Sequence, residues 1–130
     1  MKERIIQIAK MLGMEISKSD EIKALEEAKN AFQSDAELQA LMSEYETDRV
    51  LLTEEFSKAE VDREVTENLR ARIDELGSII TKNPVYIAFS EAQRAMNALM
   101  AEVNAEIKFC ITGERPSECT HDCSTCSGCH

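Results

Sequence analysis

The residues with the clearest chemistry in this sequence are cysteines that lie close together near its C-terminal end. Four of the five cysteines follow the spacing C-x3-C-x2-C-x2-C, and both histidines lie among or beside them. These residues are Cys119, Cys123, Cys126, Cys129, His121 and His130. Gaps of two and three residues allow one loop to bring several thiolates to a single metal centre. Thiolate sulfur is a soft ligand, so zinc or an iron-sulfur cluster is expected rather than calcium or magnesium.

An iron-sulfur cluster fits this spacing better than a zinc site does. Zinc knuckles and ribbons usually offer two separated pairs of ligands, whereas these cysteines form one compact run, as in cluster-binding loops. We therefore predict a [4Fe-4S] cluster in this segment. Its expected ligands are Cys119, Cys123, Cys126 and Cys129, with Cys110 or a group from a partner protein as the alternative to Cys129.

Other interpretations of the same residues stay open. Zinc would be held by four thiolates, or by three thiolates and the imidazole of His121 or His130. Without a metal, the segment would be a tail of free thiols. Cys110 stands apart from the run, because it continues an apolar helical stripe and lone buried cysteines usually behave as small apolar residues.

No set of catalytic residues is evident in the rest of the sequence. A Ser-His-Asp grouping, a Gly-rich phosphate loop and a His-Glu-x-x-His pattern are absent, and neither histidine lies in the body of the chain. C-x3-C-x2-C is also the spacing of radical enzymes that use S-adenosylmethionine, but those are longer, barrel-like chains with the motif near the front. The many Asp and Glu side chains indicate a solvated helix surface. The sequence therefore predicts a protein that is not an enzyme.

The composition indicates an all-helical protein of the cytoplasm. Gly and Pro are scarce, at four and two residues, while helix-favouring residues dominate. The net charge of -10 disfavours direct contact with nucleic acid, because phosphates would be repelled. No apolar run has the length of a membrane span, and Gln7 and Lys10 interrupt the pattern that an export signal requires. Five cysteines crowded at one end fit a reduced metal site better than a disulfide framework.

Helical periodicity predicts three helices in the first half of the chain. Apolar residues at helical steps over residues 2–16 indicate a core helix, and Gly13 is the place where it could break. The second helix is expected to run to about Phe32. Ser34 and Glu37 form a capping box, so the third helix should begin there. The buried stripe of the third helix is predicted at Leu38, Leu41, Tyr45, Leu52 and Phe56.

Two further helices are predicted in the second half of the chain. The third helix is expected to end in a turn over residues 57–62, and a stripe over residues 65–80 marks the fourth. Asn83 should end the fourth helix, because the residue before a proline is pushed out of the helical region. Pro84 suits the first turn of the fifth helix, where its missing N–H costs nothing.

The fifth predicted helix is the most regular of the set. Its apolar stripe is Val85, Phe89, Ala92, Met96, Leu99, Val103, Ile107 and Cys110. A seam of this length invites pairing with a second chain, and Gly113 is expected to end the helix. We therefore predict an all-α antiparallel helical bundle with long coiled-coil-like helices over residues 1–112. A Cys-rich metal-binding tail is predicted over residues 113–130.

Several of these features together resemble the YlbF/YmcA family of small helical bacterial regulators. The resemblance rests on the order of the helices, on the cysteine spacing of the tail and on residues of the fifth helix. Those residues are the Asn83-Pro84-Val85 junction, Phe89, Ala92-Gln93, Leu99 and Val103-Asn104. It covers nearly the whole chain and implies a cytoplasmic protein that forms a homodimer, or a hetero-oligomer with a paralogue, through its long helices.

The resemblance also implies partners and a process. Members of this family join a protein called YaaT in a complex that carries [4Fe-4S] clusters and acts on the endoribonuclease RNase Y. Through RNA processing and decay, that complex affects competence, biofilm formation and sporulation. For this chain the resemblance implies Cys119, Cys123 and Cys126 as cluster ligands, while Cys129 is an addition that could complete a cluster within one chain.

Overall fold

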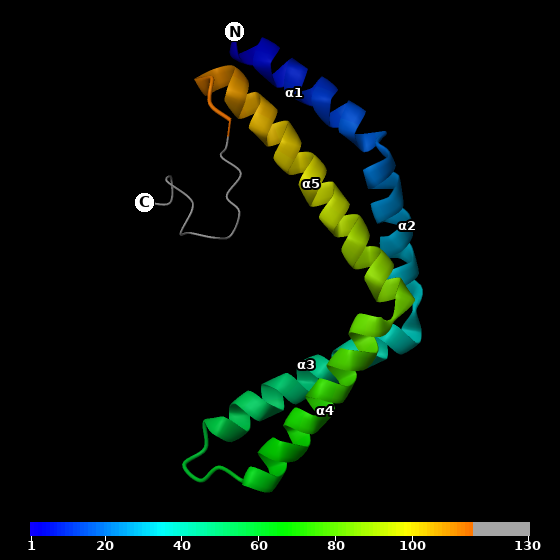
Figure 1. Cartoon of the computed structure of the whole chain (residues 1–130), viewed down its shortest axis with the longest axis vertical. Coiled ribbons are helices and arrows are strands. Elements are labelled where there is room, and N and C mark those ends of the chain that lie inside the picture. Colours follow the sequence, from blue (N-terminus) through cyan, green and yellow to red (C-terminus); the bar gives the residue numbers. More distant parts are fainter. Residues whose placement is uncertain (116–130) are drawn as a thin grey trace. The chain divides into compact units, whose positions relative to one another are not determined.

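The computed structural model describes residues 1–115, which form helices joined by short loops (Figure 1). The helices are α1 (Lys2–Ser17), α2 (Asp20–Ser34), α3 (Ala36–Phe56), α4 (Arg63–Lys82) and α5 (Pro84–Thr112). No strand occurs within residues 1–115. The prediction of an all-helical fold is confirmed for these residues, whereas the predicted cysteine-rich tail lies outside them from residue 116 onward.

Most helix boundaries follow the local capping chemistry that the sequence indicates. Ser19 caps α2, and its hydroxyl oxygen accepts a hydrogen bond from the backbone N–H of Ile22 at 3.3 Å. Asn83 separates α4 from α5 as predicted, and its side-chain oxygen accepts from the N–H of Val85 at 2.8 Å. Gly113 follows the last residue of α5 with a φ of 72°, a left-handed conformation that glycine adopts without strain.

The predicted capping box at the start of α3 is wrong by one residue. Asp35, not Ser34, is the N-cap, and its carboxylate accepts a hydrogen bond from the N–H of Leu38 at 3.0 Å. Ser34 stays in the last turn of α2, where its hydroxyl donates to the carbonyl of Asn30 at 2.7 Å. A hydroxyl that bonds back to its own helix is not free to cap the next one.

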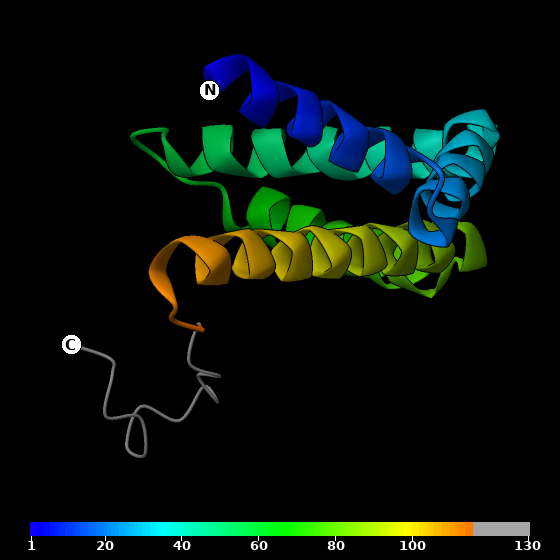
Figure 2. The same cartoon turned by 90° about the horizontal axis from the view of Figure 1, so that it is seen from above.

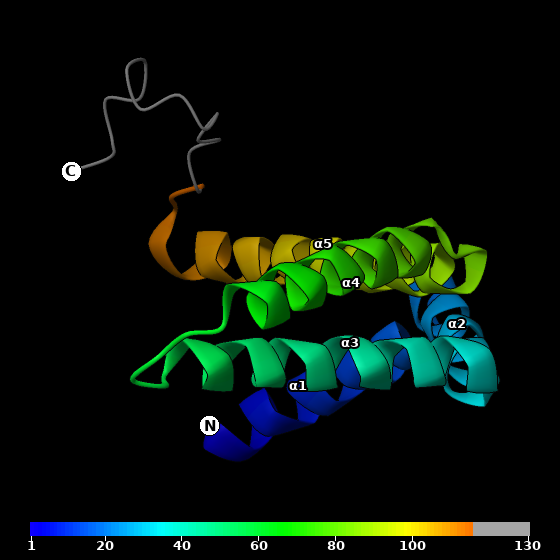
Figure 3. The same ribbon diagram turned by 90° about the horizontal axis from the view of Figure 1, so that it is seen from below.

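The most extensive packing in the described residues joins α3 to α4, which run antiparallel as a hairpin (Figures 1 and 3). The loop between them closes the hairpin at one end, as Figure 2 also shows. Leu38 and Leu76 are completely buried in these two helices, and Ile80 is 6% exposed. Arg72 of α4 donates hydrogen bonds to both carboxylate oxygens of Glu44 in α3, at 2.7 and 2.9 Å. The hairpin therefore has an apolar core and a charged cross-link.

The predicted stripe of α3 is correct at its start and wrong at its end. Leu38 is buried as expected, but Phe56 is 48% exposed and its neighbour Glu55 is only 6% exposed. The ring of Phe56 lies at the end of the hairpin beside Arg70, whose guanidinium carbon is 5.1 Å from the ring centre. Glu55 takes the inward position because its carboxylate bonds to the loop after α3, including the N–H of Asp62.

Contacts divide the chain into two units, Met1–Ala95 and Met96–His130, so the boundary lies inside α5. In the first unit, the start of α5 is joined to α2 by the stacked rings of Phe32 and Phe89. The centres of these rings are 4.7 Å apart. In the described part of the second unit, the rest of α5 is followed by three residues, 113–115.

α1 is not the core helix that the sequence predicted. It runs without a break through Gly13, but every residue from Met1 to Glu15 is exposed. Seven of the sixteen exposed large apolar side chains in the described residues lie within this stretch. Helical periodicity shows that a helix has an apolar face, but it does not show what covers that face. In the single chain, the apolar face of α1 is in contact with water.

Candidate functional site

The predicted metal site lies outside the part of the chain that the structure describes. This holds for Cys119, Cys123, Cys126, Cys129, His121 and His130. Within residues 1–115, no group of three or more Cys, His, Asp or Glu side chains is placed to hold a metal ion. The structure does describe the point from which the cysteine segment departs, which is the end of α5.

The chain that leaves α5 is held against the last turns of that helix. The N–H of Gly113 donates to the carbonyl of Phe109 at 2.7 Å, as in the left-handed C-terminal caps of helices. Arg115 then reaches back, and its guanidinium donates to the carboxylate of Glu106 at 2.6 Å. The same guanidinium carbon lies 4.3 Å from the centre of the Phe109 ring, within the range of a cation–π contact. These contacts fix the starting point of the predicted metal-binding tail.

The sequence prediction that Cys110 continues a buried stripe is wrong for the single chain. Ala92 is buried and Met96 and Leu99 are half-buried, but Ile107 is 45% exposed and Cys110 is an exposed free thiol. The stripe keeps its helical spacing, while its last turns remain in contact with water. Exposure of the thiol removes the argument that Cys110 acts as a small apolar core residue.

Glu55 is a buried carboxylate that sequence reasoning missed. The ammonium of Lys58 donates to one of its oxygens at 2.6 Å, and the N–H of Asp62 donates to the other at 3.1 Å. These two hydrogen bonds, that from Lys58 first, lower the pKa of Glu55 below its usual range, and the carboxylate raises the pKa of Lys58. Glu55 therefore ties the loop between α3 and α4 to the end of α3. A glutamate in an acidic helix carries no periodic signal that would have revealed this role.

A second charged group fixes how α3 lies against α4. Hydrogen bonds from Arg72 lower the pKa of Glu44, and bonds to Glu44 and Glu75 raise the pKa of Arg72. The side chains of Arg72 and Glu44 remain 39% and 43% exposed, so solvent screens their attraction. Residues 44 and 72 are far apart in sequence, and helical spacing within either segment gives no sign of the pairing. The pair links α3 to α4 and is expected to add little to stability.

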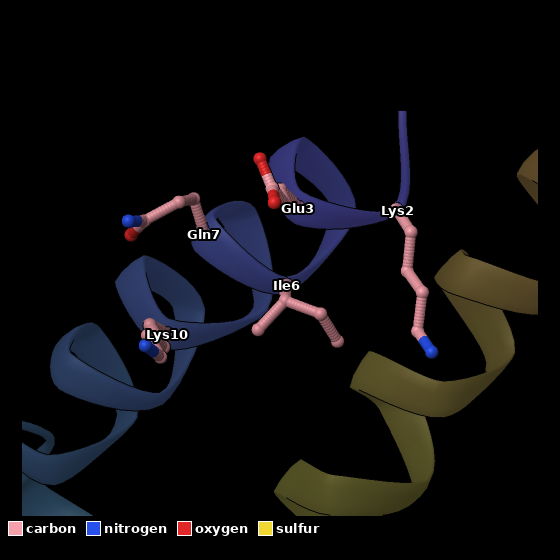
Figure 4. Close-up of a pocket in the computed structure, with 5 residues that line it drawn as sticks. All are labelled: Lys2, Glu3, Ile6, Gln7 and Lys10. Atoms are coloured by element: carbon pink, nitrogen blue, oxygen red, sulfur yellow. The ribbon is translucent and has the colours of Figure 1, made fainter.

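The hollows on the described surface are shallow and lie along helices. One of about 330 Å³ is lined by five residues of α1 alone, with Ile6 between longer polar side chains (Figure 4). The five are Lys2, Glu3, Ile6, Gln7 and Lys10. Ligand sites normally enclose most of a small molecule from several sides. A lining from one face of one helix instead suits contact with another helix.

A larger hollow of about 540 Å³ lies in the first unit and has a lining of small and acidic side chains. These are Ala24, Glu27, Ala28, Ala88, Glu91 and Ala92, contributed by α2 and the start of α5. The alanine side chains offer no chemical group to a bound molecule, and the two carboxylates, Glu27 and Glu91, are exposed to solvent. Within the part of the chain that the structure describes, none of the helices combines the length and the apolar character needed to cross a membrane.

Residues 1–115 define an all-helical fold in which several helices expose apolar side chains. The chain belongs to the YlbF/YmcA family, because the family model described as "Control of competence regulator ComK, YlbF/YmcA" matches residues 5–112. This match confirms the resemblance seen in the sequence. It covers α1 from Ile5 onward and ends at Thr112, the last residue of α5, so the cysteine segment lies beyond it. No curated protein matches the chain.

Proposed function

We propose that this chain is a non-enzymatic regulatory adaptor of the YlbF/YmcA type that acts in the cytoplasm through protein partners. The observation that carries the proposal is the family match over residues 5–112, since the family is described by its control of a competence regulator. The exposed apolar side chains of α1 and of the end of α5 support it, because large apolar surfaces of this kind mark sites of protein contact.

The proposed partners follow from the family resemblance. They are a YaaT-like protein and an RNase Y-like endoribonuclease, and the process is RNA processing and decay with effects on competence, biofilm formation and sporulation. The chain itself is proposed to form a homodimer, or a hetero-oligomer with a paralogue, in which the long helices complete an antiparallel bundle. The seam of α5 supports this association, because its last turns expose Ile107 and Ile111 at 45% and 77%.

The cysteine segment is proposed to bind a [4Fe-4S] cluster. The donor set fits such a cluster, because Cys119, Cys123, Cys126 and Cys129 supply four soft thiolates at the spacing of cluster-binding loops. When bound, a cluster supplies an oxygen-labile, redox-active cross-link. The contacts of Arg115 with α5 support the proposal, since they hold the start of the segment to a rigid helix.

Purification without oxygen tests the cluster. We expect a coloured protein with about four iron and four sulfide per chain. Cys123→Ser should abolish the colour, while the matched control Ser124→Ala should keep it, because a serine hydroxyl is not an expected ligand. A colourless protein with stoichiometric zinc would establish the zinc-binding alternative, a structural or metal-storage protein. A chelator distinguishes a structural zinc site from a cluster in the C-terminal segment, because removal of structural zinc lowers the folding stability of the protein.

Reconstitution tests the adaptor role. The isolated chain should have no ribonuclease activity, and it should bind a YaaT-like protein of the same cell and change RNA cleavage by an RNase Y-like enzyme. Exposed Ile107 on α5 is the residue to alter: Ile107→Asp should weaken these complexes and leave the helical content unchanged. Turnover of RNA by the chain alone would contradict the proposal.

A further inference from the structure

The exposed side of α3 carries apolar residues in its C-terminal half. This surface, called here the α3 outer face, consists of Glu46, Thr47, Val50, Leu51 and Glu54. Steps of three and four residues place these side chains together on one side of the helix. Leu52, which is half-buried, is two residues from Val50 and therefore points to nearly the opposite side, about 200° around the helix. Val50 and Leu51 are 48% and 45% exposed.

The two helices of the hairpin distribute their apolar residues differently. In α4 most of them gather on one side, whereas in α3 they are spread around the helix. A helix with apolar residues all round normally has neighbours on more than one side. One side of α3 packs against α4. The exposed α3 outer face is thus available for a second contact.

Two shallow hollows run along the α3 outer face, one on each side of Val50. Their volumes are about 210 and 230 Å³, and both are lined by Glu46, Val50 and Glu54. Thr53 adds to the lining of one hollow, and Leu51 adds to the lining of the other. Where two helices pack, a ridge of side chains on one helix enters grooves of this kind on the other. The shape of the surface therefore suits a helix.

The charges of the α3 outer face are carboxylates at its two ends. Glu46 and Glu54 are eight residues apart, which is about 12 Å along the helix axis, and Val50 lies midway between them. Arg49 lies 3.6 Å from the carboxylate of Glu46, but the two side chains are 58% and 67% exposed, so this ion pair is weak in water. A helix with Lys or Arg at both ends of a short apolar stripe would complement the surface.

The same charges disfavour other occupants of the α3 outer face. If this face met its own counterpart on a second copy, Glu46 would lie opposite Glu54 in an antiparallel pair and opposite Glu46 in a parallel pair. Lys58, one turn beyond Glu54, is bonded to the buried carboxylate of Glu55 at 2.6 Å. The phosphates of a nucleic acid would be repelled as well. Charge therefore favours a basic helix of a different protein.

We propose that the α3 outer face is a docking site for a basic amphipathic helix of a partner protein. Apolar side chains of that helix enter the hollows on both sides of Val50, and its Lys or Arg side chains pair with Glu46 and Glu54. The inference rests on the proposed function, since it names a surface and a kind of partner helix for the adaptor.

The first test measures binding of a labelled amphipathic helical peptide of leucine and lysine to the full chain by fluorescence anisotropy. Val50→Lys should weaken binding by at least about tenfold, because it places a like charge at the centre of the contact. The matched control Val61→Lys makes the same change at another exposed valine, in the loop after α3, and should weaken binding by less than about threefold. Equal losses in the two variants would overturn the proposal.

Two checks accompany the first test. The same peptide with glutamate in place of lysine should not bind, because carboxylates would then face Glu46 and Glu54; equal binding of this peptide would overturn the proposed pairing. Circular dichroism should show the same helical content for Val50→Lys as for the unaltered chain, since the valine is exposed and lysine favours helix.

The second test removes one carboxylate of the α3 outer face. Glu54→Gln should weaken binding of the leucine-lysine peptide by about twofold to fivefold, the range of one exposed ion pair. Glu60→Gln is the matched control, because Glu60 is an exposed glutamate in the loop after α3, and it should leave binding unchanged. A loss of the same size in both variants would show a general attraction to an acidic protein and would overturn the proposed contact.

Further outcomes separate this inference from the proposed function. Light scattering that shows a smaller mass for Val50→Lys than for Val61→Lys would mean that a second copy covers the α3 outer face, which would overturn the inference. If Ile107→Asp abolishes binding of a YaaT-like protein and Val50→Lys does not, the docking role of α3 is wrong and the adaptor stands. If Val50→Lys alone loses the peptide but the unaltered chain does not change RNA cleavage, the docking site stands and the proposed function is wrong.

Discussion

Helix α4 of the α3–α4 hairpin and helix α1 both carry an amphipathic pattern, but their apolar faces have different surroundings. In the hairpin, Leu38 and Leu76 are completely buried. In α1, Ile5 and Ile8 are more than half exposed. The difference lies in the neighbour: a short loop brings α4 back along α3, whereas the apolar face of α1 stays open in the single chain. An apolar stripe therefore predicts an interface, but not whether that interface lies within one chain or between chains.

The largest expected effect breaks the core of the hairpin. Leu76→Ala should lower the free energy of unfolding by about 2–5 kcal/mol, because it leaves a cavity at a fully buried position. Urea unfolding followed by circular dichroism measures the change. Met14→Ala on α1 is the control and should change it by less than about 0.5 kcal/mol. Equal losses in the two variants would contradict the contrast between the two regions.

A smaller effect concerns the loop end of the hairpin and depends on pH. The pKa of Glu55 is lowered in the folded chain from its usual value of 4.5, so the folded state binds this proton less readily than the unfolded state does. Its stabilising contribution is therefore complete above about pH 5.5 and is lost as the pH falls through the lowered pKa. Glu55→Gln should reduce stability at neutral pH and flatten the decline in stability towards acid.

Unfolding by urea at a series of pH values between neutral and acid measures this dependence. Glu54→Gln is the matched control, because Glu54 is the neighbouring carboxylate and is exposed. If Glu54→Gln flattens the loss of stability towards acid pH as much as Glu55→Gln does, the buried carboxylate of Glu55 has no special role.

The smallest expected effect is a gain in stability. Gly77 lies inside α4, and a methyl group there would meet the Tyr45 ring at 3.6 Å, an ordinary contact distance. Gly77→Ala should stabilise the hairpin by about 0.5–1 kcal/mol, because alanine loses less backbone entropy than glycine in a helix. Gly13→Ala meets nothing within 4 Å and should raise the helicity of α1 without raising the urea midpoint of the hairpin. Destabilisation by Gly77→Ala would show that the ring cannot accept the methyl group.

The helix ends show how far local chemistry can be predicted. Asn83 before Pro84 and Gly113 after α5 act where the sequence indicates, because proline and glycine restrict or free the backbone locally. The start of α3 was misplaced by one residue, since Ser34 and Asp35 are both good caps and only the geometry of the junction separates them. The candidate metal ligands remain predictions from spacing, because residues 116–130 lie outside the described part of the chain.

Most elements of this protein can be predicted from short stretches of its sequence: the helical composition, the apolar stripes, the capping residues, the family and the run of cysteines. Each of these depends on neighbours within a few residues, or on a pattern that repeats along one segment. Tertiary structure alone decided that Glu55 turns inward, that Arg72 bonds to Glu44 and that α1 lies exposed. These outcomes depend on which segment packs against which, and helical periodicity is the same whether a face meets its own chain, another chain or water.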